Sequence, residues 1–162
     1  MPTRVLATFL DPQRMEVEAV TEAGNRVAMD GLVEDGGEER AATPKQALLA
    51  SLAACAAMDV AAILRKKRQA VVAYEIEVTG ESADDHPRAF TGIVVEHRVS
   101  GEATDEAVRR SVELSATRYC PVSAMVSASV RIEHRFRLAS WPADTESQLV
   151  AVTGPDAPPT PR

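Results

Sequence analysis

The chain has 162 residues, of which 45% are hydrophobic and 26% are charged, and these values are typical of one soluble globular domain. Its net charge of −6 gives no electrostatic reason to expect nucleic acid or an anionic membrane as a partner. Its two cysteines are far apart in the sequence, which excludes a disulfide-rich scaffold. The N-terminus lacks the basic and apolar regions of a signal peptide, so we expect a cytoplasmic protein.

The N-terminal part of the chain predicts a small antiparallel sheet. Alternation of polar and apolar side chains in RMEVEAVT is typical of a half-buried strand. Asp11-Pro12 and Gly24-Asn25, on either side of it, are turn signals. The predicted elements are strands at 4–10, 14–21 and 26–30, followed by an acidic, glycine-rich loop over 31–42.

Residues 43–68 predict one long helix with a signal at each end. Thr43 and Gln46 form a capping box, in which each side chain accepts a hydrogen bond from the backbone N–H of the other residue. The basic residues at 65–68 complement the negative end of the helix dipole. Because the helix is apolar on every side between these ends, we expect it to be buried on every side. Asp59 in its middle argues against a transmembrane span.

The second half of the chain alternates strands with helices. Thr104 is expected to cap a helix whose inward face includes Val108, Val112, Ser115 and Tyr119. The last strand alternates most regularly, which predicts one apolar and one charged face. The predicted elements are strands at 71–79 (with Val72 and Tyr74 on the apolar side), 89–99 and 129–138, helices at 105–118 and 121–127, and a disordered, proline-rich tail at 139–162.

This order of strands, buried helix, strands, helix and strand predicts the α+β class. We expect one domain over residues 1–138, followed by the tail. One chain offers too little sheet to cover a helix that is apolar on every side. A homodimer that shares these helices would cover them, so the pattern favours a dimer.

Cys55 lies near the middle of the long helix and has two interpretations. It is either a small buried hydrophobic residue, which is common for a free cysteine, or a nucleophilic thiol. A thiolate needs a nearby cation or a helix N-terminus, and Cys55 lies about three turns inside its helix. A cation would therefore have to come from another segment. Asp59, one turn further on the same face, would disfavour the thiolate if it were ionised and close.

Cys120 precedes Pro121, which is expected to begin a short helix and to leave Cys120 at its cap. A thiolate is stabilised there by the helix dipole, but a buried cysteine at a chain reversal fits the pattern equally well. We expect His86 to be solvated and His97 and His134 to pack within their strands. No three metal-binding side chains have the spacing of a metal site, so we expect no metal and no bound cofactor.

Two segments resemble the OsmC/Ohr family, the osmotically induced and organic-hydroperoxide-resistance proteins. They are ATPKQALLASLAACAAMDV in the long helix and RYCPVSAMV around Cys120, and the EDGGEER loop before the helix fits as well. The resemblance covers residues 4–138. It implies an intertwined α+β homodimer, in which two long cysteine-bearing helices are wrapped by antiparallel sheets that mix strands of both subunits.

The resemblance also implies a two-cysteine reaction. In the family, the helix cysteine attacks the peroxide and the cysteine before proline resolves it, which assigns these roles to Cys55 and Cys120. The Cys55 thiolate would cleave the O–O bond, and its sulfenic acid would form a disulfide with Cys120. An external dithiol would then reduce the disulfide. The apolar helix around the thiol suits an organic hydroperoxide as substrate.

Arg14 and Lys45 are further positions that the resemblance singles out. The family uses an arginine from the N-terminal strand region to lower the thiol pKa, and Arg14 matches it by its distance from the Gly-Gly loop. The family glutamate that holds this arginine is replaced by Lys45, which indicates a divergent branch. Lys45 would supply the positive charge itself, or another acid would replace the family glutamate as the ion-pair partner of Arg14. The candidates for this acid are Glu16, Glu18 and Asp59.

Two hypotheses of function follow, and they differ in whether the thiols are catalytic. The first is a dimeric, thiol-dependent organic hydroperoxide reductase of oxidative-stress defence. Its catalytic residues would be Cys55, Cys120 and Arg14, with Lys45 and Asp59 as auxiliary residues. The second is a dimer that binds a small apolar or thiol-reactive ligand in the same pocket, which Lys45 favours. A metal-dependent enzyme is the third and least favoured class.

Overall fold

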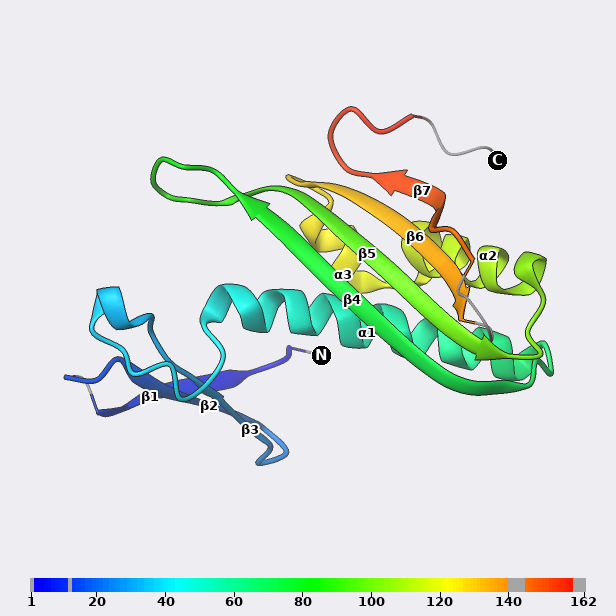
Figure 1. The fold of residues 1–162 in the computed structure, drawn as a ribbon. Helices are drawn as coiled ribbons and strands as arrows, with labels where there is room; N and C mark the ends of the chain where they lie inside the picture. Colours follow the sequence, from blue (N-terminus) through cyan, green and yellow to red (C-terminus); the bar gives the residue numbers. More distant parts are fainter. Residues whose placement is uncertain (1, 12, 140–144, 159–162) are drawn as a thin grey trace. The chain divides into compact units, whose positions relative to one another are not determined.

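The computed structural model describes residues 2–11, 13–139 and 145–158. The chain divides into two compact units, Met1–Leu48 and Leu49–Arg162. Their strands and helices follow in an order that confirms the α+β class (Figure 1). The elements are β1 (Val5–Asp11), β2 (Glu16–Thr21), β3 (Arg26–Met29), the short 3-10 helix η1 (Val33–Asp35), α1 (Pro44–Lys66), β4 (Val71–Ser82), β5 (Phe90–Gly101), α2 (Asp105–Leu114), the π-helical turn η2 (Ser115–Tyr119), α3 (Pro121–Val126), β6 (Arg131–Ala139) and β7 (Gln148–Thr153).

The first unit is the predicted three-stranded antiparallel sheet, in the order β1-β2-β3. Gly24 adopts a φ of +81° at the turn between β2 and β3, as expected for a tight hairpin. The other predicted turn falls on Asp11-Pro12, and Pro12 lies outside the described residues. Within the described residues of this unit, Ala19 is the one apolar side chain that is buried.

The acidic loop of the first unit is organised by a buried carboxylate. Asp30 accepts hydrogen bonds from the backbone N–H groups of Gly31 at 2.7 Å, Arg40 at 2.9 Å and Glu38 at 3.3 Å. The N–H of Arg40, together with the other two, lowers the pKa of the Asp30 carboxyl. A Cβ on Gly37 would lie 2.0 Å from the carbonyl oxygen of Gly31, so only glycine fits at position 37 of this loop.

The capping box at the start of α1 is confirmed. The N–H of Thr43 donates to Oε1 of Gln46 at 2.8 Å, and the N–H of Gln46 donates to Oγ1 of Thr43 at 3.3 Å. By length and composition α1 could also cross a membrane, a property that it shares with the core helices of many soluble proteins. The expected burial on every side is not achieved within one chain, because the buried residues form a single stripe of Leu52, Ala56, Val60 and Leu64.

The second unit is a four-stranded sheet in the order β4-β5-β6-β7. The strands β4–β5 and β6–β7 pair antiparallel, and β5–β6 pair parallel. The helices lie on one side of this sheet (Figure 1). Alternation on β5 and β6 turns apolar side chains toward the helices, as predicted. The buried residues on this face are Ile93, Val95, His97, Val99, Ile132, His134 and Phe136.

The prediction of a disordered tail over 139–162 is wrong for residues 148–153. These residues form β7, which pairs with β6 through contacts such as Ile132 with Thr153. Residues 140–144 and 159–162 of the predicted tail lie outside the described residues. The apolar and β-branched side chains of QLVAVT fit a pleated sheet, so the proline content of the surrounding segment was a misleading guide.

Two further expectations are corrected by local backbone geometry. Val72 was expected on the apolar side of its strand, but the pairing of β4 with β5 shifts between Val71 and Ala73, and Val72 is 85% exposed. An extra residue of this kind reverses the alternation locally. The helix predicted over 105–118 is α-helical only to Leu114, and the π-helical turn that follows leaves Tyr119 49% exposed.

Candidate functional site

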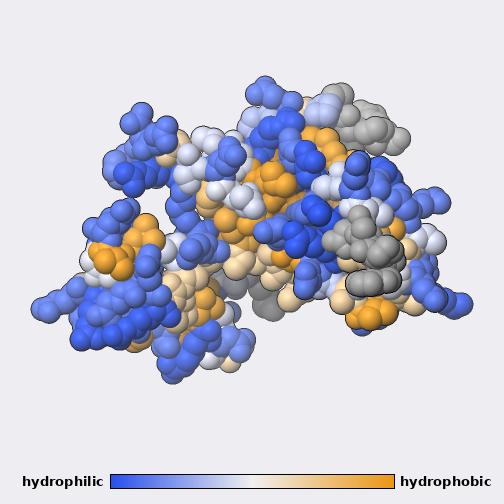
Figure 2. Space-filling model, in the orientation of Figure 1, coloured by the Kyte–Doolittle hydropathy of each residue, from blue (hydrophilic) through white to orange (hydrophobic). Residues whose placement is uncertain are grey.

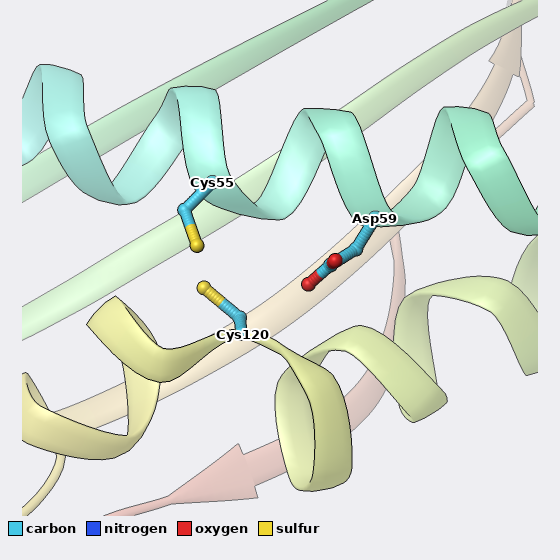
Figure 3. A group of neighbouring side chains, drawn as sticks. All are labelled: Cys55, Asp59 and Cys120. Atoms are coloured by element: carbon cyan, nitrogen blue, oxygen red, sulfur yellow. The ribbon is translucent and has the colours of Figure 1, made fainter. Parts of the chain in front are cut away.

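The helix α1 presents Cys55 and Asp59 on one face, as their spacing of four residues predicts. Both side chains are half-buried. They project toward the segment that joins η2 to α3 (Figure 3). The helix therefore brings a thiol and a carboxylate to one point beside the sheet of the second unit.

Cys120 caps the short helix α3, which begins at Pro121 as predicted. Its Sγ accepts a hydrogen bond from the backbone N–H of Ser123 at 3.3 Å. Its own N–H donates to the carbonyl oxygen of Ser115, at the start of the π-helical turn, at 3.0 Å. Cys120 is only 3% exposed, so its thiol is held at a cap and is also buried.

The two thiols and the carboxylate come together although 65 residues separate the cysteines. One ligand atom each of Cys55, Asp59 and Cys120 lies within 4.8 Å of the others. The two sulfur atoms point toward each other, and the Asp59 carboxylate lies beside them (Figure 3). The hydroxyl of Ser115 donates to Oδ2 of Asp59 at 3.2 Å. Sequence reasoning missed this serine, because its position indicated only an inward helix face.

The environment of Cys120 favours its protonated form. Burial, then a hydrogen bond with Cys55 and the negative charges of Cys55 and Asp59, raise the pKa of Cys120 to about 12. The backbone N–H of Ser123 acts in the opposite direction, but more weakly than burial. The dipole of a six-residue helix therefore does not make Cys120 a thiolate at neutral pH.

The surroundings of the thiols are apolar. Cys120 belongs to a buried cluster with residues of α1, β5 and β6, and Cys55 packs against this cluster. A groove of about 550 Å³ lies between residues 116–121 and residues 152–154, and its mixed polar and apolar lining includes Cys120 but not Cys55. The apolar cluster around the two thiols suits a substrate or ligand with an apolar body. The buried partners of Cys120 are Leu52, Ile93, Val95 and Ile132.

Arg14 and Lys45 belong to the first unit. The Nε of Arg14 lies 3.3 Å from Asp11 and 3.8 Å from Glu38. Glu18, one of the acids expected to hold Arg14, pairs instead with Arg26 at 2.6 Å. Glu38 was not among the expected acids, although it lies in the EDGGEER loop, which resembles that of the OsmC/Ohr family. Lys45 is exposed on the first turn of α1.

The histidines lie as expected. His86 is exposed, whereas His97 and His134 are 0% and 1% exposed within the sheet. Nδ1 of His97 is 2.6 Å from the hydroxyl of Tyr74, and Nε2 of His134 is 3.4 Å from the hydroxyl of Thr153. Burial lowers the pKa of His97 to about 3 and that of His134 to about 4, so both imidazoles are neutral.

The family of OsmC-like proteins matches residues 36–135, which is more than half of the chain. This chain belongs to the OsmC family. It is 36% identical to Protein YhfA of Escherichia coli strain K12 over 119 residues, which cover 73% of this chain and 86% of YhfA. The matched range includes Lys45, Cys55 and Cys120, whereas Arg14 lies before it.

Solved structures of the family have the same fold. An OsmC-like protein from Mycoplasma pneumoniae matches with a TM-score of 0.72 at 15% identity, covering 85% of this chain and 97% of that one. An organic hydroperoxide resistance protein OsmC from Legionella pneumophila matches with a TM-score of 0.63 at 17% identity, covering 84% and 96%. These likenesses confirm the predicted OsmC-like fold.

Proposed function

We propose that this OsmC-family protein reduces organic hydroperoxides with the Cys55–Cys120 pair, as part of the defence against oxidative stress. The observation that supports it is the pair of thiols facing each other in apolar surroundings. The Cys55 thiolate attacks the terminal oxygen of ROOH, the O–O bond breaks, and the alcohol leaves with a proton. Cys55 is then a sulfenic acid. The Cys120 sulfur displaces its hydroxyl as water, and a disulfide forms.

The two environments suit this division of roles. Cys55 is half-buried and can be reached by a substrate, whereas Cys120 is buried and protonated until it is needed. Conversion of Cys55 to a sulfenic acid removes the negative charge and the hydrogen bond that help to raise the pKa of Cys120. Oxidation of the first thiol thus favours the thiolate of the second.

The remaining parts of the cycle are also proposed. An external dithiol reduces the disulfide by exchange, without a bound cofactor. A cytoplasmic location suits a cycle that returns both cysteines to thiols. Arg14 supplies the cation that activates Cys55, with Asp11 and Glu38 holding its guanidinium. Lys45 adds positive charge in place of the family glutamate.

We further propose that the protein works as a homodimer. Met58 of α1 is 73% exposed and Leu48 is 41% exposed in the single chain. In the first unit, Leu6 and Phe9 of β1 are 70% and 51% exposed. Apolar residues of this kind are visible at the surface (Figure 2). A second copy that covered both α1 and the small sheet would bury the apolar faces that one chain leaves open.

The test is intact-mass measurement with thiol counting after a stoichiometric addition of cumene hydroperoxide to the reduced protein. We expect both thiols to disappear with the loss of two hydrogens in mass. Cys55→Ser should abolish the reaction, and Cys120→Ser should stop it at a sulfenic acid that dimedone traps. Two unreacted thiols in the wild-type protein would refute the peroxidase and favour the ligand-binding hypothesis.

The role of Arg14 requires a matched control. Arg14→Ala should slow the oxidation of Cys55 at neutral pH, and raising the pH should partly restore the rate by forming the thiolate without the cation. Arg26→Ala removes an arginine from the same unit, where Arg26 pairs with Glu18, and should leave the rate unchanged. Equal effects of the two substitutions would exclude a specific role for Arg14.

A further inference from the structure

We propose that Cys55, Asp59 and Cys120 form a binding site for one thiophilic divalent metal ion of the Zn²⁺ type, where the disulfide would otherwise form. The two Sγ atoms and one carboxylate oxygen lie within 4.8 Å of one another. Cys55 and Asp59 come from successive turns of α1, and Cys120 comes from the cap of α3. The spacing within the sequence therefore gave no sign of this ligand set.

The geometry is close to that of a tetrahedral site. With zinc–sulfur bonds of about 2.3 Å and a zinc–oxygen bond of about 2.0 Å, two sulfurs on one ion lie about 3.8 Å apart and a sulfur and an oxygen about 3.5 Å apart, so the cluster needs to contract by at most about 1.3 Å. Ligands at positions i and i+4 of one helix, completed by a third from a separate segment, are a common arrangement in zinc enzymes. Three protein ligands leave the fourth position open for water or a small molecule.

The donor atoms and their neighbours fit a soft metal. Two thiolates select zinc-like ions over Mg²⁺ and Ca²⁺, which prefer oxygen ligands. The hydroxyl of Ser115 donates to Oδ2 of Asp59 at 3.2 Å, which orients the carboxylate and leaves Oδ1 for an ion. The ion would also neutralise most of the negative charge that two thiolates and a carboxylate place in an apolar cluster.

Metal binding and disulfide formation would exclude each other, because both use the same two sulfur atoms. Bound metal would protect the thiols, and the disulfide would expel the ion. The binding itself is independent of the proposed peroxidase. Only its consequence, release of the ion when a hydroperoxide oxidises the pair, rests on that function.

The test is an anaerobic titration of the reduced, full-length protein with Cd²⁺ and, separately, with Co²⁺. We expect one ion per chain, with a thiolate-to-metal charge-transfer band for Cd²⁺ and the visible bands of tetrahedral coordination for Co²⁺. Asp59→Asn should weaken binding about ten-fold or more, and each Cys→Ser substitution should weaken it further. Asp85→Asn, the same change in an exposed turn, should have no effect, and Ca²⁺ should not compete.

Three results would overturn the proposal. They are the absence of saturable binding, unchanged affinity in Asp59→Asn, and equal binding by wild-type protein whose thiols have been alkylated. The alkylated protein needs no substitution, so it keeps the test decisive if a cysteine variant fails to fold. Binding without peroxide reduction would support the metal site and refute only the peroxidase.

Discussion

Mild acid should destabilise this protein through two buried histidines of the second unit. Burial, and to a smaller extent the neighbouring His134, lowers the pKa of His97 to about 3, and burial lowers that of His134 to about 4, from 6.5 in the unfolded chain. Between pH 6.5 and these lower pKa values, the unfolded chain binds protons at the two histidines that the folded chain does not bind. The stabilisation is therefore complete above about pH 6.5 and is lost as the pH falls toward the folded values.

The size of the effect follows from the number of protons. Each histidine that is charged only in the unfolded state changes the free energy of unfolding by about 1.4 kcal/mol per pH unit. Two of them give a loss of roughly 2.7 kcal/mol between about pH 5.5 and pH 4.5, a large part of the usual stability of a domain. Acids with lowered pKa values, such as Asp30 and Glu133, add to the loss mainly below this interval.

Urea unfolding across this pH range measures the effect, with His86→Asn as the control for a histidine that is exposed. His134→Gln should halve the loss, whereas the control should show the full loss. If His134→Gln does not fold, NMR titration of the wild-type imidazoles replaces it, and those of His97 and His134 should not titrate above about pH 5. A stability that does not change between pH 5.5 and 4.5 would refute the reasoning.

Three further substitutions test the packing around the site and in the loop. Leu52→Ala, which opens a cavity beside Cys120, should cost about 2–5 kcal/mol in urea unfolding, and a cost below about 1 kcal/mol would contradict its burial. Gly37→Ala should destabilise by about 1–3 kcal/mol because its methyl group meets a backbone carbonyl, whereas Gly92→Ala, with open space at the Cβ, should not. Thr43→Ala should cost about 1 kcal/mol in thermal unfolding through the lost cap, and no change would show that Gln46 alone stabilises this end.

Features that depend on neighbouring residues were predictable from the sequence. The capping box of α1 needs only Thr43 and Gln46 in the correct spacing, and both hydrogen bonds are present. The alternation in β6 identified the buried side of that strand, including His134 and Phe136. These signals are local, so they survive without knowledge of the tertiary structure.

Features that depend on distant pairing were not predictable. The strand β7 is stabilised by its ladder with β6, and the proline-rich segment around it hides this signal. The bulge at Val72 is a shift in the pairing register between β4 and β5, and the residues of β4 alone do not reveal it. In the same way, Glu38 approaches Arg14 because the loop from Gly31 folds around Asp30, which spacing in the sequence does not reveal.

Ser115, a residue with no reactive group, links the two segments that carry the cysteines. Its carbonyl oxygen accepts from the N–H of Cys120, five residues later, which is the hydrogen bond of a π-helical turn. Its hydroxyl donates to Asp59 on α1. One residue thus contacts both the carboxylate and the loop that carries the second thiol. Such turns occur often at functional sites because the extra residue changes where the helix ends. The sequence predicted a continuous helix here, since a π-helical turn has no local pattern to distinguish it from an α-helical one.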